Sequence, residues 1–265
     1  MRLAEIHVYP LKGARGIAQG RADVLAGGLR HDRRFMLVDA NGVFCSQREH
    51  RRLALVTTSL GTTSLVIGAA GADVEVALAP DGPRRRVRIW HDEADAVEVP
   101  GDASALLSSY LGQACTLVYM PDDVVRPVDP RYAAPGDRVG FADGFPVLLA
   151  ARASLDDLNA RLTEPLPMNR FRPNLVVEGG LAFDEDRHDH VRVGSLDFRM
   201  PKRCSRCQVT MVDQATAAVG KEPLRTLARY RREANKVYFA QNLIPDREGT
   251  IAVGDPLRYF GLVAT

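Results

Sequence analysis

Short runs of β-type residues recur along the whole chain, and turn signals separate them. Polar and apolar residues alternate at positions 3–9, 73–79, 86–90, 96–99 and 191–200. Continuous apolar runs lie at 35–38, 116–120, 147–150 and 174–177. Pairs such as Gly27-Gly28 and Asn41-Gly42 stand between these runs and favour tight turns. Many short strands with few helices are typical of barrels and sandwiches.

Three helices are predicted among the strands. Asp102 and Gly112 favour a helix over 103–111, a second helix starts at Ser154, and a third runs from Pro223 to about residue 232. A proline-rich stretch between 121 and 137 has little apolar periodicity and marks a linker or a crossing loop. We therefore predict a mainly β, α+β protein with two domains, residues 1–120 and residues 121–265.

Charge and hydropathy narrow the class of protein. The net charge of +2 over 265 residues is too close to zero to indicate a nucleic-acid partner. No run approaches the ~20 apolar residues of a membrane span, and the chain opens without a signal-peptide core. We expect a cytoplasmic protein. Two basic clusters, at 84–86 and 225–236, fit either solvated faces or sites for a phosphate.

The segment KRCSRC at 202–207 places two cysteines three positions apart among three cations. Nearby positive charge favours the thiolate, which is the form that binds metals and attacks electrophiles. This segment is therefore the candidate for a soft metal ligand or a nucleophile. The other cysteines, Cys45 and Cys115, lie far away along the chain, so the four do not suggest a disulfide scaffold.

Spacing alone leaves four interpretations of Cys204 and Cys207. A thioredoxin-like redox pair needs a helix after the first cysteine, whereas residues 208–212 are β-like. Structural zinc needs further ligands, for which His188 and His190 are candidates. The cysteines could also be small, partly buried residues without chemistry. In the fourth interpretation, one thiolate binds a soft metal whose other ligands come from a cofactor.

Several blocks, in the same order along nearly the whole chain, resemble the MOSC domain (molybdenum cofactor sulfurase C-terminal domain) and the β-barrel domain that precedes it. The blocks are 204–213, 221–224, 239–242 and 249–255 for the MOSC domain, 9–12, 28–39 and 46–49 for the N-terminal domain, and 171–174 as a further match. Within this family the chain is similar to the mitochondrial amidoxime reducing component and its bacterial counterparts. The resemblance implies an N-terminal β-barrel domain followed by a MOSC β-barrel domain.

The resemblance also implies a molybdenum cofactor, in which molybdenum is held by a molybdopterin. Cys207 takes the position of the catalytic cysteine that ligates molybdenum, and Cys204 is expected to support it. The matching cofactor-binding positions are Lys12, Arg34, Asp143, Arg172, Asn174, Ser205, Arg206 and Asn242. These residue types suit the cofactor's phosphate, because arginine can donate two hydrogen bonds to it and lysine supplies a point charge.

The chain departs from the family pattern at several positions. Gly13 follows Lys12, and Gly144-Phe145 follows Asp143, where relatives often carry hydroxyl residues; Ala240 replaces a usual glycine. These changes remove side-chain contacts to the cofactor and leave backbone contacts available.

The resemblance implies a molybdenum-dependent oxidoreductase that reduces small N-hydroxylated compounds. No cysteine of an iron–sulfur domain follows residue 255, so we expect electrons from a separate donor protein, which could be a flavin reductase, a ferredoxin-like protein or a cytochrome. Residues 184–189 or 225–232 are candidates for steering that donor. Two alternatives remain open: a cofactor-binding or sulfur-carrier protein with a Cys207 persulfide and no reductase activity, and a β-barrel interaction protein.

Overall fold

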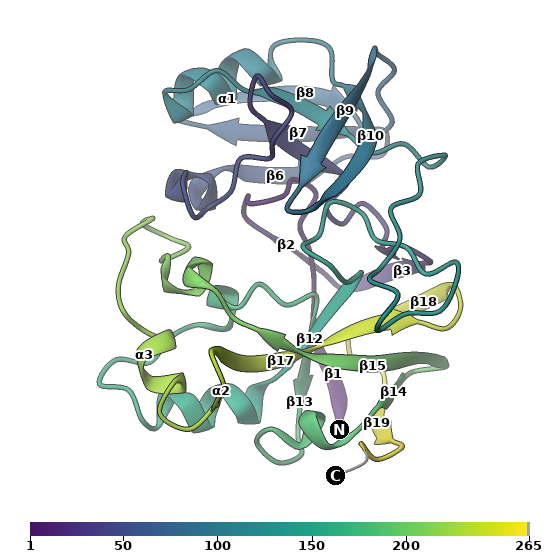
Figure 1. Cartoon of the computed structure of the whole chain (residues 1–265), viewed down its shortest axis with the longest axis vertical. Coiled ribbons are helices and arrows are strands. Elements are labelled where there is room, and N and C mark those ends of the chain that lie inside the picture. The colour runs from purple at the N-terminus through teal and green to yellow at the C-terminus, as the bar shows by residue number, and fades with distance from the viewer. Residues whose placement is uncertain (264–265) are drawn as a thin grey trace.

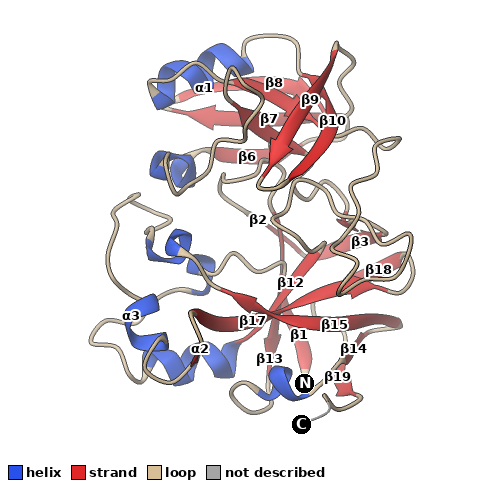
Figure 2. Cartoon of the chain, viewed as in Figure 1, coloured by secondary structure: helices blue, strands red, loops and turns tan. Residues whose placement is uncertain are grey.

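The structure is a computed structural model that describes residues 1–263. Figure 1 shows two β-rich halves stacked along the long axis, with loops crossing between them. Strands and loops make up most of the chain, and the short helices lie at the edges of both halves (Figure 2). The mainly β, α+β class predicted from the sequence is confirmed.

One nine-stranded sheet organises the lower half in Figure 1. Its order is β19-β14-β15-β17-β12-β13-β1-β2, with β16 paired to β17, and only β12 and β13 run parallel. Leu3, Leu149 and Phe198 are fully buried in its core. The strands are β1 (Arg2–Val8), β2 (Ile17–Gln19), β12 (Val147–Ala151), β13 (Leu175–Glu178), β14 (His190–Val193), β15 (Leu196–Ser205), β16 (Arg232–Glu233), β17 (Lys236–Pro245) and β19 (Leu257–Phe260).

Two smaller sheets build the upper half. One has the order β5-β11-β10-β9 and the other β6-β7-β8, and helix α1 packs its buried Leu107 into the core beside them. The elements are β5 (Phe35–Val38), β6 (Thr57–Leu60), β7 (Ser64–Ala69), β8 (Ala72–Ala77), β9 (Arg84–Ile89), β10 (Asp92–Glu98), β11 (Thr116–Tyr119), α1 (Ala103–Leu111) and the 3-10 turn η1 (Arg51–Leu55).

The two ends of the chain meet in the lower half. β1 pairs with β13, and a third small sheet joins β18 (Gly249–Ala252), β3 (Arg21–Leu25) and β4 (Gly28–Leu29). The first strands of the chain therefore pair with its last third, and the division between residues 120 and 121 stays a prediction.

The remaining helices are short and differ from the sequence expectation. They are α2 (Arg152–Asn159), α3 (Leu224–Leu227), η2 (Met168–Arg170), η3 (Asp184–Arg187) and η4 (Gln208–Met211). The prediction that Ser154 starts a helix is wrong: Ser154 lies inside α2 and donates to Glu185 Oε1 at 2.7 Å. α3 ends at Leu227 because the chain then turns into the β16–β17 hairpin.

Helix α1 and the hairpin at Asn41-Gly42 are confirmed. α1 spans 103–111 and ends at Gly112, whose φ of 70° is the left-handed conformation that glycine tolerates. Asp102 precedes the helix but makes no capping hydrogen bond with its side chain. Val38 bridges to Phe44 across the turn that contains Gly42. Within residues 1–263, no helix is long and apolar enough to cross a membrane.

Candidate functional site

A cavity opens between the two halves, and segments far apart in the sequence line it. Residues 44–48 and Trp90 come from the upper half, and residues 142–145, 171–172 and 204–207 come from the lower half. A junction between two structural units is a common place for a ligand site.

Eight of the nine residues predicted to bind the cofactor or its metal line this one cavity. They are Lys12, Asp143, Arg172, Asn174, Ser205, Arg206, Cys207 and Asn242. The remaining residue, Arg34, does not line it. Arg33 and Arg48 do, so five cationic side chains face one carboxylate in the lining. This excess of positive charge favours an anionic ligand.

The Arg34 side chain contacts residues 120 and 122 instead of lining the cavity. Its Nε donates to the Met120 carbonyl at 2.9 Å, and its Nη1 pairs with Asp122 at 2.8 Å. Arg33 points into the cavity instead: its Nη1 donates to Asp32 at 2.6 Å and to Asn174 Oδ1 at 3.0 Å. The sequence alone does not distinguish which of the two consecutive arginines faces the cavity. We assign the cavity position to Arg33.

Lys12 and Asp143 form an ion pair on the cavity wall. Lys12 Nζ donates to Asp143 Oδ1 at 2.5 Å and to the Phe141 carbonyl at 2.7 Å. Burial lowers the pKa of Lys12, and Asp143 offsets only part of that effect. Burial opposes ionisation of Asp143, but Lys12 and Trp90 outweigh it and hold the pKa of Asp143 well below its usual range. Since 68% of the Asp143 side chain is exposed, burial has little effect on this carboxyl, and the ion pair with Lys12 sets the direction of its pKa shift.

Arg172 and Arg206 extend the positive wall toward the cysteines. The Arg172 guanidinium lies 4.4 Å from the centre of the Tyr9 ring, and burial lowers the pKa of Arg172 to about 10. Arg206 donates to the Phe171 carbonyl at 2.7 Å and to Cys204 Sγ at 2.9 Å. Its third nitrogen, Nε, is buried and has no hydrogen-bond partner in the described part of the chain. A buried donor without a partner is costly, so an acceptor from a bound ligand would stabilise this arrangement.

The two cysteines of the KRCSRC segment stand in different surroundings. Cys204 is the next-to-last residue of strand β15 and accepts the Arg206 hydrogen bond, yet burial raises the pKa of its thiol in spite of that arginine. Arg206 thus stabilises the Cys204 thiolate as expected, but burial outweighs that effect. Cys207 is half-buried in the cavity lining. Cys45 lines the same cavity although it is distant in sequence, and burial raises the pKa of Cys45 to about 12.

The β-like continuation predicted after Cys207 is also wrong. Residues 208–211 form the 3-10 turn η4, because the Thr210 amide and hydroxyl both donate to the Cys207 carbonyl, at 3.1 and 3.0 Å. No α-helix follows the pair, so the dipole that activates a thioredoxin-like cysteine is missing. His188 and His190 do not line the cavity, which disfavours a zinc site with these cysteines.

The predicted cofactor-binding residues with uncharged polar side chains differ in how many of their hydrogen-bonding groups already have a partner in the protein. Asn174 is 1% exposed and fully engaged: its amide oxygen accepts from Leu148 N and Arg33, and its amide nitrogen donates to the His7 carbonyl. Asn174 therefore positions Arg33. Asn242 donates to the Lys202 carbonyl at 3.1 Å and lines the cavity, and Ser205 lies exposed beside it.

Arg126 is a functional candidate that the sequence did not reveal. Its side chain is 1% exposed, and it donates to Asp92 and to the carbonyls of Gly140, Ala142 and Asp143. Among the described residues, the backbone amides of 142–145 have no recorded hydrogen-bond partner. Consecutive free amides can bind an anion, so the loop offers backbone donors where relatives carry hydroxyl side chains.

A pair of buried glutamines joins the two halves beside the cavity. Gln47 and Gln214 exchange reciprocal amide hydrogen bonds of 3.3 and 3.2 Å. Gln47 also binds the Gly13 carbonyl, and Arg172 Nη1 donates to Gln214 Oε1 at 3.3 Å. These contacts hold the segment after Cys207 against the upper half. The sequence did not predict this contact, because the two glutamines are far apart along the chain and belong to no common motif.

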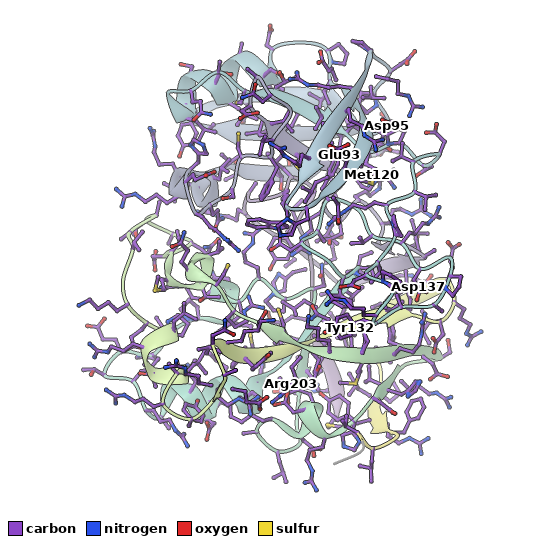
Figure 3. The ribbon with its side chains drawn as sticks, in the orientation of Figure 1. Glu93, Asp95, Met120, Tyr132, Asp137 and Arg203 are labelled. Carbon is purple, nitrogen blue, oxygen red and sulfur yellow. The ribbon has the colours of Figure 1, made fainter. Side chains whose placement is uncertain are left out.

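The basic cluster at 84–86 is paired with carboxylates on the surface, whereas in the cluster at 225–236 only Arg225 and Arg231 are in ion pairs among the described residues. Arg86 pairs with Glu93 and Asp95, which are labelled on the upper half in Figure 3. Arg225 pairs with Glu222 in the same way. Solvated faces therefore describe these pairs better than phosphate sites.

Two family models match the chain in sequence order. The MOSC N-terminal beta barrel domain matches residues 1–114, and the MOSC domain matches residues 136–258. The fold and the cavity thus define a two-part MOSC protein, and the chain belongs to this family.

Named relatives are similar over nearly the full chain. Mitochondrial amidoxime-reducing component 1 of Mus musculus is 31% identical, over 98% of this chain and 82% of its own length. The Homo sapiens component 1 is 29% identical over 98% of this chain and 83% of its own length. Mitochondrial amidoxime reducing component 2 of Bos taurus is 28% identical over 96% of this chain and 82% of its own length.

Proposed function

We propose that the cavity binds a molybdenum cofactor and that the protein reduces small N-hydroxylated compounds with electrons from a separate donor protein. The observation that carries this proposal is the assembly of Cys207 with five cationic side chains in one cavity. The relatives' names, amidoxime-reducing components, point to the same class of substrate.

The residues present fit such a cofactor. Its phosphate is anionic, and the lining offers Lys12, Arg33, Arg172 and Arg206, with one buried guanidinium nitrogen of Arg206 left without a partner. The free amides of 142–145 add uncharged donors of the right kind. Cys207 would supply a thiolate sulfur, the type of ligand that soft metals prefer, whereas magnesium and calcium prefer oxygen ligands.

Each residue has a defined role in this proposal. Cys207 would ligate the metal, Arg172, Arg206 and Lys12 would hold the anionic group, and Asn174 would keep Arg33 in place. When bound, the cofactor supplies the two-electron redox chemistry that removes oxygen from nitrogen. The net reaction consumes two electrons and two protons and yields the amine or amidine and water.

The donor, its docking site and the location of the protein stay predictions. A flavin reductase, a ferredoxin-like protein or a cytochrome would bring electrons to the Cys207 side of the cavity. Arg231 forms an ion pair with Asp186. This pair joins segments 184–189 and 225–232, which we expected to steer the donor, and it reduces the net charge of each segment. A cytoplasmic location also stays a prediction, since the named relatives are mitochondrial.

Reduction of benzamidoxime tests the proposal. We expect benzamidine to form when reduced methyl viologen drives protein purified from a host that makes the molybdenum cofactor. The same protein from a host that lacks the cofactor is the control and should form none. Protein that yields no benzamidine, binds no molybdenum and carries a Cys207 persulfide in its mass spectrum would instead support the sulfur-carrier alternative.

A further inference from the structure

The chain's only tryptophan occupies an unusual backbone position at the cavity. Trp90 is the first residue of the two-residue turn that joins β9 to β10. Its φ is 58°, a left-handed value that such turns normally give to glycine or asparagine. A bulky aromatic side chain is strained there, and residues kept in strained conformations cluster at functional sites.

Two contacts fix the indole of Trp90 in the cavity wall, a hydrogen bond and an aromatic contact. Its Nε1 donates to Asp143 Oδ1 at 3.1 Å, the same oxygen that receives Lys12. The Phe44 ring stands edge-on, with centroids 4.6 Å apart and an interplanar angle of 71°. The β9–β10 hairpin thus delivers an aromatic ring, at a fixed orientation, to the cavity that Cys207 also lines.

A third neighbour of the indole is the guanidinium of Arg48. Its central carbon lies 4.0 Å from the ring centroid, which is stacking distance. In the described residues, the Arg48 side chain makes no ion pair and no recorded hydrogen bond, and the residue is exposed. Arg48 is therefore held over the ring by stacking alone, and another planar group can take its place.

An amidoxime or an N-hydroxyguanidine is close in shape to a guanidinium. Each is a planar carbon bonded to nitrogens with delocalised electrons, and each can stack on an aromatic face. We propose that Trp90 is a specificity-determining residue, whose indole stacks the planar carbon–nitrogen group of an amidoxime or N-hydroxyguanidine after that group displaces Arg48. This inference rests on the proposed function, and it makes conjugated N-hydroxy compounds the preferred substrates over saturated ones.

Steady-state kinetics with a planar and a saturated substrate test the inference. In the cofactor-loaded protein, Trp90→Leu should raise the KM for benzamidoxime by roughly tenfold and leave the KM for N-hydroxypiperidine, which has no planar group to stack, within about twofold. Trp90→Gly relieves the backbone strain and should give the same split, which protects the test against misfolding of the leucine variant. Arg51→Ala changes a nearby exposed arginine outside the cavity lining and serves as the control.

Fluorescence of the single tryptophan gives an independent readout of binding. Benzamidoxime should quench it in the wild-type protein, and Arg48→Ala should tighten that binding by roughly threefold, because the competing guanidinium is gone. Equal changes in KM for both substrates, or loss of bound pterin from Trp90→Leu, would overturn the inference and make Trp90 part of the cofactor wall. A wild-type protein that reduces neither substrate rejects the proposed function, while the quenching titration still decides whether Trp90 binds the planar group.

Discussion

Replacing Cys207 with serine lowers benzamidoxime reduction by about 100-fold or more in cofactor-loaded protein. Serine is similar in size but offers oxygen, a hard ligand, in place of the soft thiolate sulfur. The arginines and Lys12 are unchanged in this variant, so we expect bound pterin to stay near the wild-type amount. Turnover with reduced methyl viologen and pterin analysis of the same preparation measure the two effects separately.

Cys204→Ser is the matched comparison for this prediction. Cys204 accepts a hydrogen bond from Arg206, and burial raises the pKa of its thiol, so it is a supporting residue. We expect a loss of less than about tenfold, below the roughly 10–100-fold found when a residue that directly orients a metal ligand is replaced. Wild-type turnover by Cys207→Ser, or an equal loss in both variants, contradicts the assignment of Cys207.

The second large effect concerns Arg126. Arg126→Met should lower the free energy of unfolding by about 3 kcal/mol, because a buried charged donor is removed and the carbonyls of Gly140, Ala142 and Asp143 lose its hydrogen bonds. Thermal unfolding should shift by roughly 10 °C for a chain of this size. The loop 142–145 should also lose its orientation, so the variant should retain less pterin after purification.

Arg84→Met provides the control for Arg126, since Arg84 also pairs with an aspartate but is 52% exposed. Exposed pairs contribute between zero and about 1 kcal/mol, so its unfolding should match the wild type closely. If Arg126→Met unfolds and binds pterin like this control, then the buried guanidinium does not organise the loop.

The strand pattern could be predicted because its signals are local. The runs at 35–38, 116–120 and 147–150 became β5, β11 and β12, with ends that differ by one residue or less. Their partners could not be predicted, since β1 pairs with β13 across more than a hundred residues. The length of α3 was overestimated, because the β16–β17 hairpin outweighs the helix propensity of the residues after Pro223.

The candidate site could be predicted where a motif fixed the residue, and not where tertiary contacts chose it. Lys12, Arg172 and Cys207 lie in distinctive blocks and meet in the cavity. Arg33 rather than Arg34 faces the cavity because Asp32 and Asn174 hold its guanidinium. Ala240, where relatives usually have glycine, has a φ of 73°, so the backbone keeps the conformation that glycine would adopt with less strain.

The content of molybdenum and pterin in purified protein tests the central claim most directly. Protein from a host that makes the cofactor should contain about one molybdenum atom and one pterin per chain. An Arg172→Ala, Arg206→Ala double variant, which removes two cations from the cavity, should contain much less of both. Wild-type protein that carries neither molybdenum nor pterin after anaerobic purification from such a host would contradict the claim.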